Sequence, residues 1–298
     1  MRKSFVKAVI LQQLRVILRK FTMYARQVIE RCREITFRPY IIKKTIDTVS
    51  FDFFVGDPTG KSWYDTGWNC GEVELKFLRE NMVSPGDIIF DVGGHHGWYA
   101  IILSHYVGEH GRVITFEPNP TNCEIIKGNI SLNQLSNVRV ENIAIGSQNQ
   151  DAVVTNASDT AVKSGKIDDR YKPESWRRKS VSRGIEVKMK SLDSYAHELN
   201  VIPSLLKIDV EGYEVEVLRG SHSILASHPK LCLEIHHPDT LARYGTTLED
   251  IFEVIPLKEY RCWLQVDDNE MPHSVRNLNV NVVKDIGHRF HIYAIPQR

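Results

Sequence analysis

Short apolar segments alternate with amphipathic segments along most of this 298-residue chain, and this alternation restricts its fold more than any other feature. The segments typical of buried strands are "IIFDV", "GRVITFEP", "VRVENIAIG", "LLKIDVEG" and "KLCLEIHHP". Between them lie segments with helical spacing, such as "NCEIIKGNISLN" and "YEVEVLRGSHSILAS". This order predicts an α/β fold, in which a largely parallel, doubly wound sheet carries helices on both faces.

The two ends of the pattern differ from its middle. "TIDTVSFDFFVGD" (45–57) predicts a strand and "GEVELKFLRENM" (71–82) predicts a helix ahead of the alternating region. At the other end, "YRCWLQVD" (260–267) and "HRFHIYAIP" (288–296) are strand-like and are separated by a polar loop without a helix. Because parallel strands need a long crossover, this last pair is expected to form an antiparallel hairpin at the sheet edge.

The stretch "IIFDVGGHHGWYAIIL" (88–103) predicts a strand, a glycine turn and a helix in immediate succession. Asp91 stands at the end of the strand, and Gly93, Gly94 and Gly97 allow the unusual dihedrals and the close ligand approach that such a turn needs. The N-terminus of the following helix offers unpaired amides to an anionic group. Dinucleotide enzymes and methyltransferases both use this arrangement.

Two features favour S-adenosylmethionine over a dinucleotide. Asp91 is placed to face the cationic end of that cofactor, and the spacing Gly93-x-x-x-Gly97 departs from G-x-G-x-x-G. Glu117 ends the second strand, where an acid accepts hydrogen bonds from ribose hydroxyls. Asn142 follows the third strand and either reaches the adenine or serves as a turn residue. The residues assigned to the cofactor are Asp91, Gly93, Gly94, His95, Gly97, Glu117, Asn119 and Asn142.

The motifs "DVGGHHGWYA", "GRVITFEPNP", "NVRVENIAIG", "SLLKIDVEGYEVEVLRG" and "LCLEIH" together resemble the FkbM family of S-adenosylmethionine-dependent methyltransferases. The resemblance covers roughly residues 63–240, and "KIDVEGYE" is its most distinctive piece. It implies the class I methyltransferase fold, a Rossmann-like sheet of seven strands that ends in an antiparallel edge hairpin. It also places His95 in the cofactor turn, where the family has Asn or His, and leaves His96 without a role.

Four residues are assigned to the acceptor end of the site. Asp209 and Glu211 follow the fourth strand, and sheets of this kind bind ligands at the carboxyl ends of their strands. Glu234 and His236 lie on one face of the fifth strand. A carboxylate or imidazole there can accept the proton of an attacking hydroxyl. Alternatively, Glu234 and His236 could bind a divalent metal together with Asp209, but no metal is assigned. Glu214 is expected only to complement the dipole of the next helix.

Charge is distributed unevenly along the chain. Residues 1–44 carry 12 Lys and Arg against two acids, and apolar residues recur at helical spacing from Val6 to Ile35. We therefore expect a basic amphipathic helical arm (1–44) before a methyltransferase domain (45–298) whose core motifs span 84–240. The arm either packs on the domain or lies on an anionic membrane surface. No stretch approaches the length of a membrane span, and the five cysteines form no CxxC pair, which favours the cytoplasm, free or at the inner face of a membrane.

Residues 156–184 break the alternation, with many basic and few apolar residues. This insertion is expected to be either a mobile surface loop or a lid over the substrate.

The sequence as a whole predicts an S-adenosylmethionine-dependent O-methyltransferase, and the resemblance implies a hydroxyl on a sugar, glycan precursor or secondary metabolite as acceptor. The alternatives are a nucleic-acid methyltransferase, an NAD-dependent oxidoreductase of nucleotide sugars, or a binding protein with a degenerate pocket. Nucleic acid is the less favoured partner, and the sequence does not fix the oligomeric state.

Overall fold

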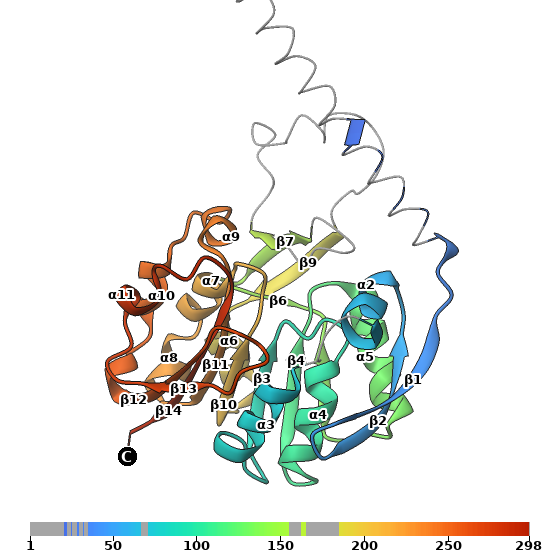
Figure 1. Ribbon diagram of the computed structural model, residues 1–298, viewed down its shortest axis with the longest axis horizontal. Helices are drawn as coiled ribbons and strands as arrows, with labels where there is room; N and C mark the ends of the chain where they lie inside the picture. Colours follow the sequence, from blue (N-terminus) through green and yellow to red (C-terminus); the bar gives the residue numbers. More distant parts are fainter. Residues whose placement is uncertain are drawn as a thin grey trace, which may run out of the picture.

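In the computed structural model, residues 35–66, 71–154, 162–164 and 185–297 are described, together with 21, 22, 25, 29 and 32. The centre of the molecule is an eight-stranded sheet (Figure 1). In spatial order its strands are β13 (His273–Val275), β12 (Tyr260–Gln265), β14 (Phe290–Pro296), β11 (Lys230–Ile235), β10 (Leu205–Ile208), β3 (Ile88–Val92), β4 (Arg112–Phe116) and β5 (Val138–Glu141).

The strands from β11 to β5 are parallel, whereas β14 runs antiparallel to β11 and to β12. This confirms the mostly parallel sheet with an antiparallel edge. The short strand β13 pairs with β12 and adds an eighth strand to the seven that were expected. The loop between β12 and β14, expected to lack a helix, contains both β13 and the four-residue helix α11 (Val280–Val283), because Val283 is apolar enough to be buried against the core.

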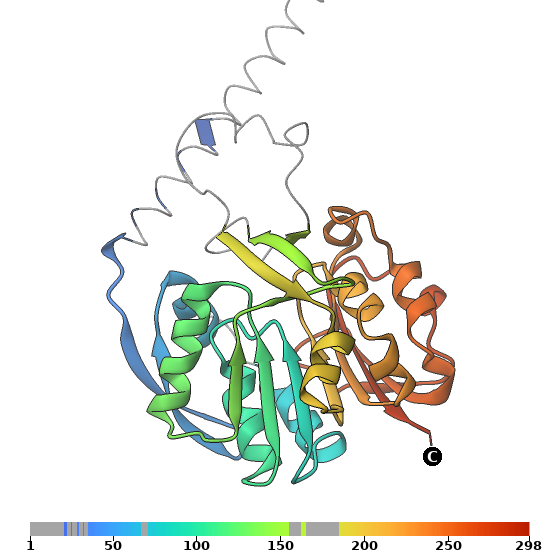
Figure 2. The same ribbon diagram turned by 180° about the vertical axis from the view of Figure 1, so that it is seen from behind.

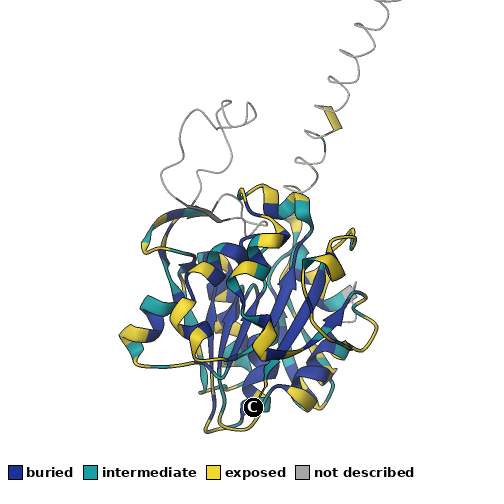
Figure 3. Ribbon diagram, turned by 90° about the vertical axis from the view of Figure 1, so that its left-hand side faces the viewer, coloured by how far each residue is buried: buried dark blue, intermediate teal, exposed yellow. Residues whose placement is uncertain are grey.

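Successive residues of each strand face opposite sides of the sheet, and each side has its own helices. Ile89 of β3 belongs to an apolar cluster with α3 and α4, and its neighbour Phe90 belongs to a cluster with α6, α7, α8 and α10. Figure 1 is viewed from the side of α3 and α4, Figure 2 shows the opposite side, and Figure 3 shows the strands as the buried centre. These helices are α3 (Glu72–Asn81), α4 (Trp98–Val107), α6 (Leu192–Leu199), α7 (Glu214–Arg219), α8 (His222–Ala226) and α10 (Leu248–Val254).

The segment before the sheet is a hairpin, and the single strand predicted over 45–57 is wrong. β1 (Tyr40–Ile46) pairs antiparallel with β2 (Val49–Val55), and Asp47 in the turn adopts a φ of 50°. β1 begins inside the stretch 1–44 that was assigned to the helical arm. The β-prone run Tyr40-Ile41-Ile42 pairs along its whole length with β2, so it belongs to the hairpin.

The hairpin is bound to helix α5 (Pro120–Leu132) and its C-cap. Asparagine side chains there form hydrogen bonds with the β2 backbone, as a neighbouring strand would. Asn133 accepts a hydrogen bond from the backbone nitrogen of Asp52 (3.0 Å) and donates one to its carbonyl (2.7 Å). Asn129 accepts from the backbone nitrogen of Phe54 (2.6 Å). The edge of β2 is thus satisfied by two helical asparagines, which positions the hairpin and the residues after it beside the sheet.

Three other segments differ from the sequence prediction. "VRVENIAIG" is divided into β5 and β6 (Ala144–Ile145), and "YEVEVLRGSHSILAS" is divided into α7 and α8 at Gly220. β6 belongs to a second, four-stranded sheet with β9 (Ile185–Lys190), β7 (Gln150–Val154) and β8 (Val162–Ser164). β8 lies within the insertion predicted over 156–184, and the rest of that insertion lies outside the described residues.

The remaining elements are short. They are the single turn α2 (Pro58–Gly60), the π-helical turn η1 (Lys61–Thr66), α9 (Pro238–Ala242) and the 3₁₀ turn η4 (Leu257–Glu259). In the arm, the described residues from 21 to 36 are helical, and most of the predicted helix lies outside the described residues. Phe21, Cys32 and Ile35 of its apolar stripe are exposed rather than packed on the domain. Among the described residues, no helix has both the length and the apolar character of a membrane span.

Candidate active site

A cleft of about 480 Å³ opens where β3, β10 and β11 end. Its walls come from the glycine turn after β3, from the π-helical turn η1 and from the residues that follow β10 and β11. The lining residues are Ser62, Trp63, Tyr64, Gly93, Gly94, His95, Trp98, Tyr99, Asp209, Glu211, Glu234, His236 and Arg289. Residues predicted for the cofactor and residues predicted for the acceptor therefore meet in one cavity.

Gly93 is needed because the turn touches the end of a neighbouring strand. It adopts a φ of 96°, and a Cβ there would lie 1.7 Å from the carbonyl oxygen of Asp209. Gly94 likewise has no room for a side chain, since a Cβ would lie 2.2 Å from the Thr115 hydroxyl. These glycines bring the turn after β3 into contact with the ends of β10 and β4, and this contact forms the cleft floor.

Glu117 is fully buried just behind the glycine turn. Its carboxylate accepts hydrogen bonds from the backbone nitrogens of His95 (2.8 Å) and Asn119 (2.8 Å). Burial raises the pKa of Glu117 to about 7, although these hydrogen bonds oppose the increase. The Asn119 side chain caps α5 by accepting from Thr121 N (2.9 Å), and the Asn142 amide donates to the carbonyls of Glu117 and Pro118 (3.0 Å each). Both asparagines hold the loop around Glu117.

A row of polar side chains crosses the sheet beneath α4. Thr115, Asp91 and Lys207 occupy paired positions on β4, β3 and β10. Thr115 donates to Asp91 Oδ2 (2.9 Å), Lys207 Nζ lies 3.3 Å from Asp91 Oδ1, and the same ammonium lies 4.4 Å from the ring centre of Tyr99. Burial lowers the pKa of Lys207, but Asp91 and Asp209 outweigh this effect and raise it. The cation nearest to Asp91 is therefore supplied by the chain itself.

The two histidines of the turn have different surroundings. His95 lines the cleft, where its Nδ1 lies 2.8 Å from the Tyr64 hydroxyl and its ring lies 4.8 Å from that of Trp63. His96 is fully buried and stacks on His95, and its Nε2 lies 3.3 Å from Asp57 Oδ2. Since Asp57 caps the turn α2, His96 joins the cofactor turn to the segment that carries Trp63 and Tyr64.

At the ends of β10 and β11, four carboxylates surround His236. Its Nδ1 donates to Glu214 Oε1 (2.6 Å), and its Nε2 lies 3.3 Å from Glu211 Oε2 and 3.7 Å from Glu234 Oε1. Asp209, Glu234 and His236 each direct a ligating atom to the same point, within 4.8 Å of one another. Burial lowers the pKa of His236, but the hydrogen bonds to Glu211 and Glu214 outweigh it and raise the pKa to about 11.

Glu214 has a larger part than the sequence predicted. It begins α7, as a dipole-complementing acid does, but its side chain is fully buried, and it also accepts the backbone nitrogen of Gly212 (3.0 Å). Glu211 stands in the sharp turn before it, with a φ of 53° and an exposed fraction of 43% for its side chain. Glu214 thus orients the His236 imidazole from the buried side, and Glu211 faces the cleft.

Glu234 is fixed by two cations that sequence reasoning missed. Arg289 Nη1 donates to Glu234 Oε1 (2.6 Å), and His291 Nε2 lies 3.2 Å from Oε2. Burial opposes ionisation of Glu234, but His291 and Arg289 hold its pKa well below its usual range. Burial and the charge of Glu234 in turn raise the pKa of Asp209 to about 7, against the opposing charge of Lys207. Arg289 directly precedes β14 and His291 lies on it, and this spacing of two residues was a signal for a shared face.

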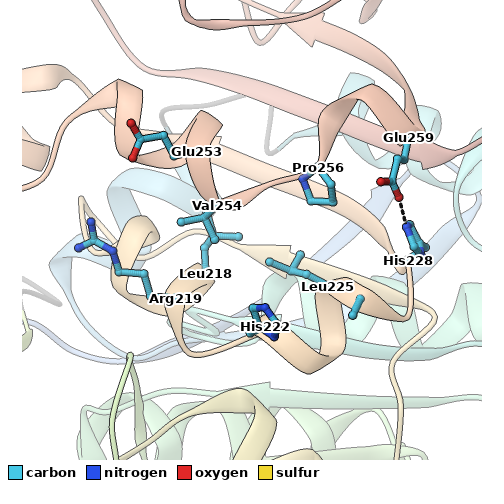
Figure 4. A pocket seen from close by; sticks show the side chains of 10 residues that line it. Leu218, Arg219, His222, Leu225, His228, Glu253, Val254, Pro256 and Glu259 are labelled. Carbon is cyan, nitrogen blue, oxygen red and sulfur yellow. Dashed lines mark hydrogen bonds and ion pairs between the residues drawn. The ribbon is translucent and has the colours of Figure 1, made fainter.

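A second hollow of about 590 Å³ lies between α7, α8 and η4, and it contains none of the predicted site residues (Figure 4). Leu218, Leu225 and Val254 line it, and His228 pairs with Glu259 at one end. It is formed by elements on the side of the sheet that α6 covers. Substitutions in this hollow therefore serve as controls for substitutions in the cleft.

Residues 91–262, more than half of the chain, match the family model described as "Methyltransferase FkbM domain". The chain belongs to the FkbM family. As an FkbM family member it is a methyltransferase, and its cofactor is S-adenosyl-L-methionine.

Individual proteins similar to this FkbM chain are distant from it. It is 23% identical over 174 residues to "Methyltransferase 1" of Beauveria bassiana, and this match covers 51% of the chain and 69% of the relative. An S-adenosylmethionine-dependent O-methyltransferase of Thermotoga maritima matches with a TM-score of 0.40 at 13% identity, covering 76% of this chain and 65% of that one. Fibrillarin of Aeropyrum pernix with bound S-adenosyl-L-methionine matches with a TM-score of 0.41 at 12% identity, covering 75% and 74%.

The cleft of this FkbM chain fits the cofactor at the glycine turn, because Gly93, Gly94 and His95 line the cavity and the glycines let a ligand approach the backbone closely. Asp91 Oδ1 is buried without a hydrogen bond, and the Lys207 ammonium lies 3.3 Å from it. Of the residues predicted for the cofactor, Asp91, Gly97, Glu117 and Asn119 are buried behind this wall, and Asn142 is exposed beside it. Their contact with the cofactor stays a prediction.

Proposed function

We propose that this FkbM methyltransferase acts on a hydroxyl group, as an O-methyltransferase whose acceptor is a sugar, a glycan precursor or a secondary metabolite. The observation that carries this proposal is the acid–imidazole group formed by Asp209, Glu211, Glu234 and His236, which lines the cleft at the ends of β10 and β11. An alcohol is a weak nucleophile that must lose its proton during transfer, and this group can receive one.

S-adenosylmethionine supplies an electrophilic methyl group on a positively charged sulfur. The acceptor oxygen forms a bond to the methyl carbon as the carbon–sulfur bond breaks, with its electron pair left on sulfur, and the hydroxyl proton passes to a carboxylate of the acid–imidazole group, Asp209 or Glu211, because His236 is already protonated. Glu214 keeps the His236 ring in one orientation through Nδ1, so that Nε2 faces the cleft. Holding the oxygen in line with the methyl carbon converts a bimolecular encounter into a positioned reaction.

The cleft lining favours a small hydroxylated acceptor over a nucleic acid. The acceptor end is acidic, which repels a phosphate backbone, and its few basic groups are already paired: Lys207 with Asp91, and Arg289 with Glu234 and Asp268. Nucleic-acid binding depends on cationic contacts to phosphates. Trp63, with an exposed fraction of 41%, stands at the rim and offers an apolar face to a sugar ring.

Methyl transfer from radiolabelled S-adenosylmethionine tests this proposal. We expect label on methyl glycosides or glycan precursors, in a bond that survives mild alkali because an ether is not hydrolysed, and about a 100-fold lower rate for His236→Gln. His228→Gln, in the second hollow, is the matched control and should keep the wild-type rate. Label that appears only on RNA, or that alkali releases as from an ester, would overturn the proposal.

We also propose that the basic arm contacts an anionic membrane surface. The exposure of Phe21, Cys32 and Ile35 supports this over packing on the domain, and the 12 basic residues among the first 44 supply the attraction. Deletion of residues 1–38 leaves β1 intact, since that strand begins at Tyr40. Co-flotation with anionic vesicles is expected for the full chain and not for the deletion variant; equal flotation of both would contradict the proposal.

A further inference from the structure

We propose that Asp209, Glu234 and His236 bind a divalent cation at the acceptor end of the cleft. This inference rests on the proposed function, since the cation would hold and activate the acceptor hydroxyl. The three side chains come from the ends of two neighbouring strands, β10 and β11, and converge on one point that opens to the cavity. Their donor atoms, two carboxylate oxygens and one imidazole nitrogen, form a common ligand set for divalent metals.

The spacing of these atoms suits one ion. Metal–nitrogen and metal–oxygen bonds of about 2.0–2.2 Å place the ligands of one ion roughly 3–4 Å apart. His236 Nε2 lies 3.7 Å from Glu234 Oε1, and all three ligating atoms lie within 4.8 Å of one another. The Asp209 side chain is 28% exposed and its Oδ2 lies 3.7 Å from Lys207 Nζ, so Asp209 is the ligand that would rotate toward the other two.

Glu214 provides a second and independent observation. A metal-binding histidine usually donates its other ring nitrogen to a carboxylate, which fixes the tautomer and the direction of the ring. Glu214 is fully buried and accepts from His236 Nδ1 at 2.6 Å, which leaves Nε2 directed at the other two ligands. Glu214 does not touch the cation point itself, so it is a positioning residue.

The charge balance also favours a cation. Asp209, Glu211, Glu214 and Glu234 surround His236, and these four carboxylates face two permanent cations, Arg289 beside Glu234 and Lys207 beside Asp209. Arg289 also binds Asp268 and approaches Glu234 from the position just before β14, so Glu234 retains lone pairs on its cleft side. A divalent ion would relieve the repulsion between carboxylates that are held together by the fold.

The bound cation would act as a Lewis acid on the acceptor oxygen and lower the pKa of its hydroxyl. Asp209 and His236 would then be ligands rather than bases. Glu211, whose partly exposed carboxylate lies 3.3 Å from His236 Nε2, would receive the hydroxyl proton. An imidazole with two carboxylates suits manganese or zinc better than calcium, which prefers oxygen ligands alone.

Manganese binding in the absence of cofactor and acceptor tests this site, by calorimetry and by the electron paramagnetic resonance of free Mn²⁺. We expect one ion per chain in the wild type and no binding by His236→Ala or Asp209→Asn. Glu214→Gln should weaken the affinity by about 10- to 100-fold, and His228→Ala, in the second hollow, should leave it unchanged. Circular dichroism shows whether each variant is folded.

Absence of Mn²⁺ and Zn²⁺ binding by the folded wild type would overturn the inference, and so would binding that His236→Ala and Asp209→Asn retain. These outcomes are separate from failure of the proposed function. If chelated enzyme still methylates a hydroxyl at the full rate, the O-methyltransferase assignment stands and the metal site is refuted. If metal binds as expected but no hydroxyl is methylated, the metal site stands and the acceptor proposal fails.

Discussion

At the scale of single residues, the cofactor turn is held by contacts with the ends of two neighbouring strands. Gly93 touches the backbone of Asp209 at the end of β10, and the backbone nitrogen of His95 is bound by Glu117 at the end of β4. The conformation of the turn therefore depends on the ionised carboxylate of Glu117. This links the geometry of the cleft to a group whose pKa lies at about 7.

Glu117 should make cofactor affinity depend on pH. Below its pKa of about 7 the carboxyl is protonated and loses acceptor strength toward the amides and toward a ribose, so binding should weaken as pH falls. We expect affinity for S-adenosylhomocysteine to be up to about tenfold lower at pH 6 than at pH 8 in the wild type, by titration calorimetry. Glu117→Gln is the control. The ratio of its affinities at pH 6 and pH 8 gives the pH dependence that comes from the ligand and from other groups. Equal pH dependence in both proteins would contradict this role.

The residues that sequence reasoning missed share one cause. Lys207, Glu214 and Arg289 act on the site through partners that are distant in sequence or on another strand, such as Lys207 on Asp91 and Arg289 on Glu234. Strand-end position alone identified Asp209 and Glu234, because position follows from local pattern. Pairing between charges depends on strand order and register, which a local pattern does not contain.

At the scale of elements, the hairpin β1–β2 is fixed to two helices by its turn. Asp47 binds Arg79 of α3 (Nε to Oδ2, 2.5 Å) and the Tyr106 hydroxyl of α4 (2.9 Å). The pKa of Asp47 is lowered mainly by the hydrogen bond with Arg79 and also by that with Tyr106, although burial opposes the decrease. The hairpin leads into α2 and η1, so this contact also helps to place one wall of the cleft.

The Asp47 contacts should stabilise the protein in a pH-dependent way. Because the folded pKa is lowered from the usual 3.8, the stabilisation is complete above that value and is lost as pH falls through the folded pKa. Asp47→Asn keeps a residue that tolerates a positive φ, and should lower the free energy of unfolding by about 1–2 kcal/mol at pH 7. Denaturant unfolding should show a smaller difference near pH 3. Asp52→Asn, in the same hairpin, is the control, and an Asp47 effect that is constant with pH would disprove the account.

The alternation of apolar segments predicted the central sheet, its order of elements and its antiparallel edge. It did not predict the hairpin β1–β2, because Tyr40 to Lys44 was grouped with the basic residues of the arm. Nor did it predict that β6 leaves the central sheet, because the apolar pattern of "VRVENIAIG" is continuous. The break between β5 and β6 lies at Asn142, whose side-chain amide binds the carbonyls after β4.

At the scale of the whole molecule, the chain brings the glycine turn after β3 and the acid–imidazole group together in one cleft. The sheet brings the ends of β3, β10 and β11 together, and Ser62, Trp63 and Tyr64 of η1 line another side of the cleft. The family membership establishes a methyltransferase that uses S-adenosyl-L-methionine. Our central proposal is that this cleft holds the cofactor with its reactive end toward Asp209 and His236.

A crystal structure with S-adenosylhomocysteine tests that claim most directly. We predict the homocysteine part against Gly93 and Gly94, the ribose hydroxyls within hydrogen-bond distance of Glu117, and the sulfur facing Asp209 and His236. A product molecule bound elsewhere, or bound in this cleft with its sulfur directed away from Asp209 and His236, would contradict the account.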